Sequence, residues 1–161
     1  MCDRNLKKLA KLLIEKKLTI ATAESCTGGL LASRLTDVSG SSNFLLESHI
    51  TYANSAKNKY LKVSEEILST QGAVSPECAK AMAEGLFQLA NCDIALCTTG
   101  IAGPTGGSKE KPVGLVYISC HYDGKTFVEK HVLPSFLPRK LMKFMFSEKA
   151  IELATKTLIQ Q

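Results

Sequence analysis

The amino-acid sequence predicts an α/β fold: a three-layer α/β/α sandwich around a mixed, mostly parallel sheet of about five strands. Three observations support this prediction. Short apolar or β-branched runs alternate with segments in which apolar residues recur at helical spacing. The dipeptide Asp123-Gly124 separates two strand-like runs, which is a strong signal for an antiparallel hairpin. The 161 residues contain no internal repeat and no linker, so we expect one domain over 1–161.

The first half of the chain predicts two strands set among three helices. Leucine, alanine and isoleucine at helical spacing indicate an amphipathic helix over 3–17. A β-branched, apolar run predicts a strand over 18–24, and a helix over 27–37 follows. We expect a second strand over 44–53 and a short helix over 54–62.

The second half predicts a helix, three strands and a last helix. Ser75-Pro76-Glu77 begins a helix that runs to about residue 90, because it combines a capping oxygen, a proline at the first helical position and an acid in the first turn. The continuous apolar run 93–99 predicts a strand that is buried on both faces. Strands over 113–121 and 125–133 form the hairpin, and a long helix is expected from 138 to about 159.

Composition narrows the class of protein and its partners. Hydrophobic residues make up 45% and charged residues 22% of the chain, as in ordinary globular proteins. No run approaches the roughly 18 apolar residues of a membrane span, and no apolar segment follows the charged start, so neither a membrane partner nor a signal peptide is predicted. The net charge of +5 falls mainly on the two terminal helices, and the first of them has no aromatic residues among its lysines. We therefore expect solvated helix faces and no nucleic-acid partner.

Cysteine usage indicates a reducing compartment. Five cysteines lie inside predicted elements of a chain that is large enough to fold without disulfides. They are Cys26, Cys78, Cys92, Cys97 and Cys120. We expect buried, reduced thiols and a cytoplasmic protein.

Ser25 stands where a predicted strand runs into a predicted helix, in the sequence Glu24-Ser25-Cys26-Thr27-Gly28-Gly29. Unpaired backbone N–H groups and the helix dipole at such a turn stabilise developing negative charge. An acyl-transfer nucleophile needs this environment, because donors must already be in place for the tetrahedral oxyanion. The same sequence is also typical of a residue that merely caps a helix.

A second candidate segment is the loop 100–108, which carries four glycines and follows the apolar strand. In an open α/β sheet, ligands bind outside the carboxyl ends of the strands, so this loop and Ser25 are expected to share a crevice. Glycines let the backbone approach a ligand closely. The loop is neither a P-loop nor a G-x-G-x-x-G segment, and a merely mobile loop is the alternative.

Activation of Ser25 by histidine or by a metal is poorly supported by the sequence. The three histidines fall in predicted strands, no Gly-x-Ser-x-Gly or Ser-x-x-Lys pattern is present, and Cys92 and Cys97 have no matching second pair of metal ligands. Lys57 remains, because Tyr52 and Lys57 also lie where a predicted strand ends. A lysine desolvated in a crevice can accept the serine proton, although a surface lysine is the alternative.

Five ordered segments together resemble the CinA carboxy-terminal domain family, the bacterial nicotinamide mononucleotide deamidases. They are Ala23-Glu24-Ser25-Cys26-Thr27-Gly28-Gly29, Ser39-Gly40-Ser41-Ser42, Tyr52-Ala53-Asn54-Ser55-Ala56-Lys57, Gly72-Ala73-Val74-Ser75 and Gly100-Ile101-Ala102-Gly103-Pro104-Thr105-Gly106-Gly107. The resemblance covers nearly the whole chain. It implies the same three-layer α/β/α fold and hydrolysis of the carboxamide of nicotinamide mononucleotide to nicotinate mononucleotide and ammonia, a step of pyridine-nucleotide salvage.

The resemblance also implies roles for individual residues. Ser25 corresponds to the nucleophile and Lys57 to its general base, while Tyr52 and Thr99 help to position the amide or the proton relay. The residues expected to bind the nucleotide substrate are Thr27, Gly28, Gly29, Ser41, Ser42, Gly100, Ala102, Gly103, Gly106, Gly107 and Arg139. Family members are serine amidohydrolases that need neither a metal nor a cofactor, and a homodimer is expected.

The chain departs from this family before its last helix. Many relatives carry a Gly-Asp-Arg segment there and a further arginine in the first turns of the helix. Here Arg139 keeps one guanidinium, the glycine and the acid are missing, and Lys143 stands near the place of the second arginine. Lysine does not replace arginine at a bidentate phosphate site, so substrate affinity is the property most affected. A non-catalytic nucleotide-binding module of the same fold is the alternative function.

Overall fold

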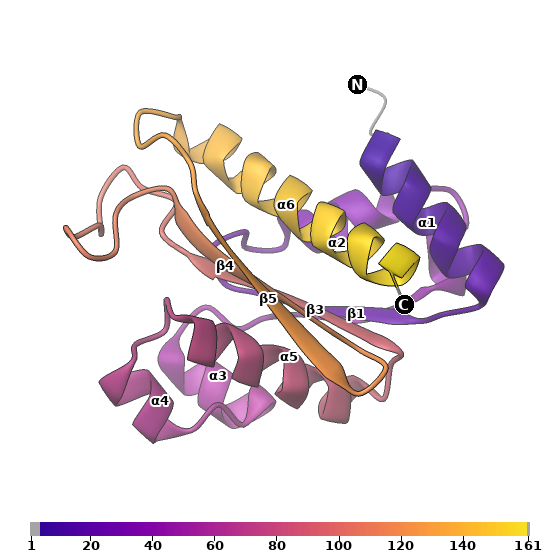
Figure 1. Ribbon diagram of the computed structural model, residues 1–161, viewed down its shortest axis with the longest axis horizontal. Helices are drawn as coiled ribbons and strands as arrows, with labels where there is room; N and C mark the ends of the chain where they lie inside the picture. Colours follow the sequence, from indigo (N-terminus) through magenta and orange to yellow (C-terminus); the bar gives the residue numbers. More distant parts are fainter. Residues whose placement is uncertain (1–3, 161) are drawn as a thin grey trace.

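A five-stranded mixed sheet lies between two layers of helices in the computed structural model, which describes residues 4–160 (Figure 1). The strands stand in the order β2-β1-β3-β4-β5. Their bounds are β1 Ile20–Glu24, β2 Leu45–Ile50, β3 Ile94–Gly100, β4 Leu115–Tyr122 and β5 Lys125–Val132. β1 pairs in parallel with β2 and β3, whereas β4 is antiparallel to both β3 and β5. Four strands therefore share one direction, and the predicted fold class is confirmed.

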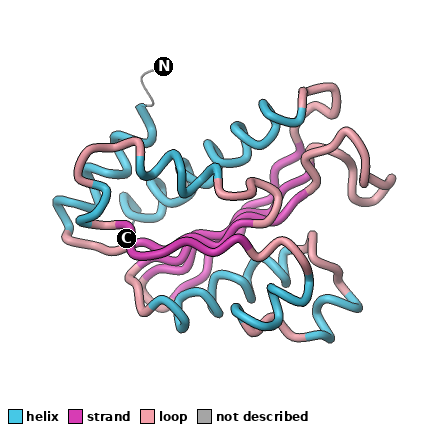
Figure 2. The backbone as a smooth tube through the Cα atoms, turned by 180° about the vertical axis from the view of Figure 1, so that it is seen from behind, coloured by secondary structure: helices cyan, strands magenta, loops and turns pink. Residues whose placement is uncertain are grey.

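Helices cover both faces of the sheet (Figures 1 and 2). One layer holds α1 (Arg4–Lys16), α2 (Leu30–Thr36) and α6 (Arg139–Gln160), and the other holds α3 (Asn54–Leu61), α4 (Glu65–Thr70) and α5 (Pro76–Ala90). A short 3-10 helix, η1, spans Ser41–Asn43. Each layer has its own apolar core, one on α1, α2 and α6 and one on α3 and α5.

The sequence anticipated most of these elements. β3 is buried along its length up to Gly100, as its continuous apolar run predicted. Asp123 and Gly124 both have positive φ, 49° and 73°, which fits the two-residue hairpin turn expected between β4 and β5. The five cysteines of the described residues are buried and free, as expected. Residue 3, where the first helix was expected to begin, lies outside the described residues.

Several details differ from the sequence predictions, among them the end of β2 at Ile50 rather than at residue 53. Helix α2 starts at Leu30 rather than near 27, because Cys26–Gly29 form a turn in which Gly28 and Gly29 have φ of 58° and 94°. Helix α4 was not anticipated. Its signals were nevertheless present: the Ser64 hydroxyl accepts the Ile67 N–H at 3.2 Å, and two acidic residues occupy the first turn.

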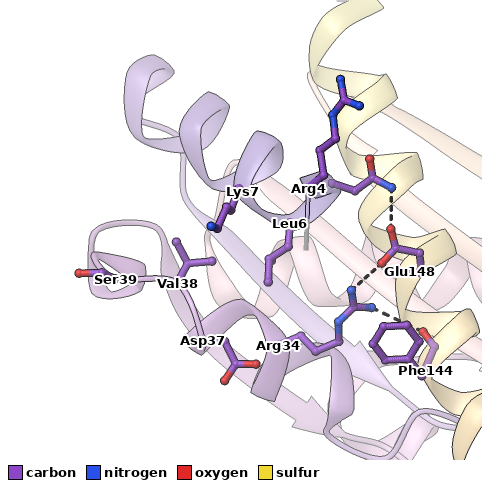
Figure 3. A pocket seen from close by; sticks show the side chains of 10 residues that line it. Arg4, Leu6, Lys7, Arg34, Asp37, Val38, Ser39, Phe144 and Glu148 are labelled. Atoms are coloured by element: carbon purple, nitrogen blue, oxygen red, sulfur yellow. Dashed lines mark hydrogen bonds and ion pairs between the residues drawn. The ribbon is translucent and has the colours of Figure 1, made fainter. Parts of the chain in front are cut away.

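A buried ion pair joins α2 to α6 (Figure 3). The guanidinium of Arg34, a residue only 4% exposed, donates to Glu148 Oε2 at 2.5 Å and to Ser147 Oγ at 2.6 Å, and it lies 4.4 Å from the centre of the Phe144 ring. Asn5 on α1 donates to the other oxygen of Glu148 at 2.6 Å. Asn5, Arg34, Phe144 and Glu148 are among the residues that line a hollow of about 880 Å³ between α1, α2 and α6. These contacts link α1, α2 and α6, which are far apart in the sequence, on the same face of the sheet.

Within residues 4–160, no helix combines the length and the apolar character that a membrane crossing requires.

Replacing Glu148 by alanine should lower the free energy of unfolding by about 3 kcal/mol, because Arg34 would keep a buried charge without its carboxylate. Urea denaturation followed by circular dichroism measures the change. Glu152→Ala, on the same helix, is the matched control: Glu152 pairs with partly exposed Lys149, and such a pair contributes about 0–1 kcal/mol. Equal losses in the two variants would contradict the assigned role of Glu148.

Candidate active site

Ser25 lies directly after β1, at the carboxyl end of the parallel strands. Its backbone N–H donates to the Thr98 carbonyl at 3.1 Å, and its own carbonyl accepts the Gly28 N–H at 3.2 Å. The residue is 9% exposed, so its side chain is largely withdrawn from water. Strand β3 and the turn that precedes α2 thus fix the position of Ser25.

Glu24 holds this turn in shape. The residue is fully buried at the last position of β1, and its carboxylate accepts three backbone N–H groups at the start of α2: those of Gly29 and Leu31 at 3.0 Å and of Ala32 at 2.8 Å. It also accepts the Thr27 hydroxyl at 2.6 Å. The N–H groups at the start of a helix have no partner within the helix, so the carboxylate from the preceding strand satisfies them. Its negative charge also interacts favourably with the positive end of the helix dipole. The sequence analysis assigned no role to Glu24.

The amine of Lys57 reaches Ser25 from α3. Lys57 is 1% exposed, and its Nζ lies 3.0 Å from Ser25 Oγ. The same nitrogen donates to the Thr51 carbonyl at 2.7 Å and to the Tyr52 carbonyl at 2.9 Å. Both carbonyls belong to the segment that connects β2 to α3, so the end of β2 positions the lysine next to the serine.

These contacts suit an uncharged amine. Carbonyl oxygens can only accept, so they take both N–H groups of a neutral lysine, and its lone pair is then directed at the Ser25 hydroxyl. Burial lowers the pKa of Lys57 below its ordinary value of 10.5, against the opposing influence of the nearby thiols of Cys78 and Cys26. Lys57 can therefore accept the proton of Ser25, the chemistry of an activated nucleophile.

Cys26, which follows Ser25, is a poor competitor for the role of nucleophile. Burial raises the pKa of its thiol to about 12. The reactive form of cysteine is the thiolate, which is scarce at neutral pH when the pKa is this high. Ser25, with a base at hydrogen-bond distance, is the better-equipped group.

A cleft of about 190 Å³ opens beside Ser25. Its lining includes Cys26, Tyr52, Arg139 and the loop 100–106. Gly106 has φ of 89°, and a side chain there would meet only Ile101 at 3.9 Å, so its backbone conformation rather than close packing requires glycine. The expected proximity of Ser25 and the glycine-rich loop is thus present in the structure.

Two cations from α6 approach this cleft. Arg139 donates to the Gly103 carbonyl at 2.6 Å, and its other terminal nitrogen lies 3.4 Å from the Tyr52 hydroxyl. Lys143, one helical turn later, has its Nζ 3.5 Å from the position that a Cβ on Gly28 would occupy. The amine of Lys143 therefore lies over the Ser25 turn, on the same side of α6 as Arg139.

Some of the other residues expected at the site line the cleft, and the rest make contacts elsewhere. Gly100, Ala102, Gly103 and Gly106 line the cleft. Thr27 and Gly29 donate to Glu24, and Gly107 packs against Val113, where a side chain would come within 2.7 Å of backbone nitrogen. The Thr99 hydroxyl donates to the Ala73 carbonyl at 2.7 Å, on the Gly72–Ser75 segment rather than at Ser25 or Lys57.

Ser41 and Ser42 do not meet Ser25 within one chain. They lie in η1, before the first residue of β2, whereas Ser25 and Thr51 lie beyond the opposite ends of β1 and β2. The six residues of β2 span about 17 Å, which separates these serines from the cleft. The two parts of the predicted binding set are therefore at opposite edges of the sheet.

Metal and histidine chemistry have no visible basis among residues 4–160. No group of three or more His, Cys, Asp or Glu side chains is arranged there to hold a metal ion. His49 and His131 contact Glu47 and Glu129 on their own strands, and His121 contacts Thr126. The hydrogen bond that reaches Ser25 Oγ comes from Lys57.

Comparisons with a family model, with curated proteins and with solved structures all point to the same family. The family model for the CinA C-terminal domain matches residues 3–158. A CinA-like protein of Syntrophus aciditrophicus is 47% identical over 150 residues, which cover 93% of this chain and 36% of that protein. The curated relatives that match most strongly are similarly long, so the chain spans about a third of their length.

Solved structures resemble the chain over nearly its whole length. A CinA superfamily protein from Klebsiella pneumoniae superposes with a TM-score of 0.93 at 28% identity, covering 99% of this chain and 98% of that one. The competence/damage inducible protein CihA from Agrobacterium tumefaciens gives a TM-score of 0.88 at 37% identity, covering 96% and 95%.

Replacing Glu24 by glutamine should destabilise the protein by about 2 kcal/mol, because an amide NH₂ would face one of the four donors that the carboxylate now accepts. Chemical denaturation measures the loss. Glu47→Gln makes the same exchange at an exposed site on β2 and should change stability by no more than about 0.5 kcal/mol. A Glu24→Gln protein as stable as this control would refute the capping role.

Proposed function

The chain belongs to the CinA C-terminal domain family, and we propose that it hydrolyses the carboxamide of nicotinamide mononucleotide to nicotinate mononucleotide and ammonia. The observation that carries the proposal is the placement of the Lys57 amine, buried and 3.0 Å from Ser25 Oγ. That pair supports an amidohydrolase of the serine/lysine type. The identity of the nucleotide comes from the resemblance of the five sequence segments to the family of deamidases.

The proposed reaction has two halves. Lys57 takes the hydroxyl proton of Ser25 while Ser25 Oγ bonds to the carboxamide carbon, and the ammonium then gives this proton to the amide nitrogen as the carbon–nitrogen bond breaks and ammonia leaves. Water next attacks the acyl ester, Lys57 accepts a proton from that water, and the proton returns to Ser25 Oγ as nicotinate mononucleotide is released. Each proton taken up is given back, so no external acid or base is consumed.

The charges around the cleft fit the two ends of this substrate. The pyridinium ring is positive, so an uncharged Lys57 beside Ser25 avoids repulsion at the reacting amide. The phosphate is negative, and Arg139 and Lys143 on α6 are the cations that we assign to it. The cleft of about 190 Å³ is smaller than the roughly 300 Å³ at which ligand pockets begin, so it suits the ring and its amide while the phosphate lies at the rim.

Ser25→Ala and Lys57→Ala should each lower ammonia release from nicotinamide mononucleotide at least about 1,000-fold, because one lacks the nucleophile and the other its base. An enzyme-coupled ammonia assay measures the rate, with folding checked by circular dichroism. Lys59→Ala is the matched control on the same helix. Its side chain is exposed and its amine lies over the Tyr60 ring, so activity should change less than twofold.

The outcomes separate the two candidate functions. Activity in the parent that both variants lose supports the serine/lysine deamidase. A folded parent that binds the nucleotide but releases no ammonia would instead favour a non-catalytic nucleotide-binding module. If Ser25→Ala keeps its activity, Ser25 is not the nucleophile.

Activity should rise with pH, and the midpoint of this rise should lie below pH 10.5, the ordinary lysine value. The neutral amine is the active form, and burial lowers the pKa of Lys57, so the fraction of neutral Lys57 increases as pH rises through that lowered value. The pH profile of kcat/KM reports this titration in the free enzyme. A midpoint at 10.5 or above would show that burial does not favour the neutral amine.

A further inference from the structure

The side-chain hydroxyl of Thr51 is buried and makes no hydrogen bond within the described part of the chain. The residue follows β2 and is 1% exposed, and its hydroxyl oxygen is buried without a hydrogen-bond partner among residues 4–160. Among the described residues, Thr51 Oγ1 is the one buried side-chain nitrogen or oxygen atom without a hydrogen-bond partner. Buried polar groups in native proteins are nearly always hydrogen-bonded, so such a hydroxyl calls for a physical explanation.

The backbone of the same residue is fully engaged. The Thr51 N–H donates to the Glu24 carbonyl at 2.9 Å, and the Thr51 carbonyl accepts from Lys57 Nζ at 2.7 Å. The hydroxyl therefore belongs to a residue that is bonded both to the strand carrying Ser25 and to the amine of the proposed base. No other residue makes both contacts in the described part of the chain.

The number of protons on Lys57 changes during the proposed reaction. The neutral amine has two N–H groups, which the carbonyls of Thr51 and Tyr52 accept. The ammonium has a third, and in the free enzyme Ser25 Oγ is at hand to accept it. Once Ser25 Oγ carries an acyl group, it becomes an ester oxygen with little capacity to accept, and the third N–H needs another acceptor.

The groups that face Lys57 do not balance its charge. Cys78 on α5 and Cys26 beside Ser25 are the titratable neighbours that act on it, and burial raises the pKa of both thiols, which keeps them uncharged at neutral pH. Neutral oxygen atoms must then stabilise the ammonium. The carbonyls of Thr51 and Tyr52 are two of them, and the Thr51 hydroxyl has unused acceptor capacity next to one of these carbonyls.

We propose that Thr51 is a positioning residue of the deamidase, whose hydroxyl oxygen accepts the third N–H of the Lys57 ammonium while Ser25 Oγ is bonded to the acyl group. This proposal rests on the proposed function. The hydroxyl forms no covalent bond and transfers no proton. It keeps the ammonium oriented until the proton passes to the leaving nitrogen or back to Ser25.

Thr51→Val tests this role, because valine has nearly the same shape and lacks only the hydroxyl. We expect kcat for ammonia release to fall about tenfold with KM within twofold, and the acid limb of the kcat profile, which reports the substrate-bound enzyme, to move to lower pH, because the ammonium loses an acceptor. The melting temperature should stay the same or rise, since a buried, unpaired hydroxyl has been removed. Thr51→Ser, which keeps the hydroxyl, should restore kcat to within about threefold of the parent.

A second measurement does not depend on turnover. In the Ser25→Ala protein, Lys57 has lost its serine acceptor, so the hydroxyl of Thr51 should matter more to its ammonium. Titration of the ¹⁵N-labelled Lys57 amine by NMR should give a lower pKa in Ser25→Ala/Thr51→Val than in Ser25→Ala alone.

Two results would overturn the proposal: an unchanged Lys57 pKa in that double variant, or parental kcat and pH profile in Thr51→Val. A fall in kcat that accompanies a lower melting temperature, and that Thr51→Ser does not reverse, would also overturn it in favour of a packing role. If the parent releases no ammonia but the double variant shows the lower Lys57 pKa, the deamidase function fails while the contact between the hydroxyl and Lys57 is supported.

Discussion

The burial of one amine is the constraint on which the candidate site depends. An ammonium is costly to desolvate, and Lys57 is 1% exposed, with hydrogen bonds to one hydroxyl and two carbonyls rather than to a carboxylate. The fold resolves this conflict by supplying two backbone carbonyls and one serine hydroxyl. That set satisfies a neutral amine completely, and the amine then has its lone pair directed at the serine. The same contacts that make burial tolerable therefore create a base.

The parallel order of the first three strands makes this arrangement possible. Parallel neighbours end at the same edge of a sheet, so Ser25 after β1, Thr51 after β2 and the glycine-rich loop after β3 converge although they are far apart in the sequence. Glu24 then closes the turn beside Ser25 by accepting the N–H groups of α2. Positioning is thus achieved mostly by backbone groups, which carry little signal in the amino-acid sequence.

This explains what the sequence could and could not predict. Periodicity and turn residues predicted the sheet, the hairpin and the described α-helices except α4, whose short length hid its Ser64 cap. The proximity of Ser25 and Lys57 was predicted from the ends of strands. The partners of Glu24 and the buried hydroxyl of Thr51 were not, because both depend on backbone atoms of other elements. Ser41 was grouped with the site by motif, but it precedes β2 rather than following it.

The cations near the cleft come from α6, whereas Ser25, Cys26 and Lys57 belong to other elements, and this division is consistent with the proposed substrate. The reacting end, at Ser25, is built from a serine, an amine whose pKa burial lowers and a thiol whose pKa burial raises to about 12. The cations lie on α6, where Arg139 is held by the Gly103 carbonyl and Lys143 lies over Gly28. A substrate with a positive ring at one end and a phosphate at the other matches this order. A molecule with its negative charge beside the scissile amide would leave Lys143 and Arg139 without a partner and would favour a protonated Lys57, which cannot act as a base.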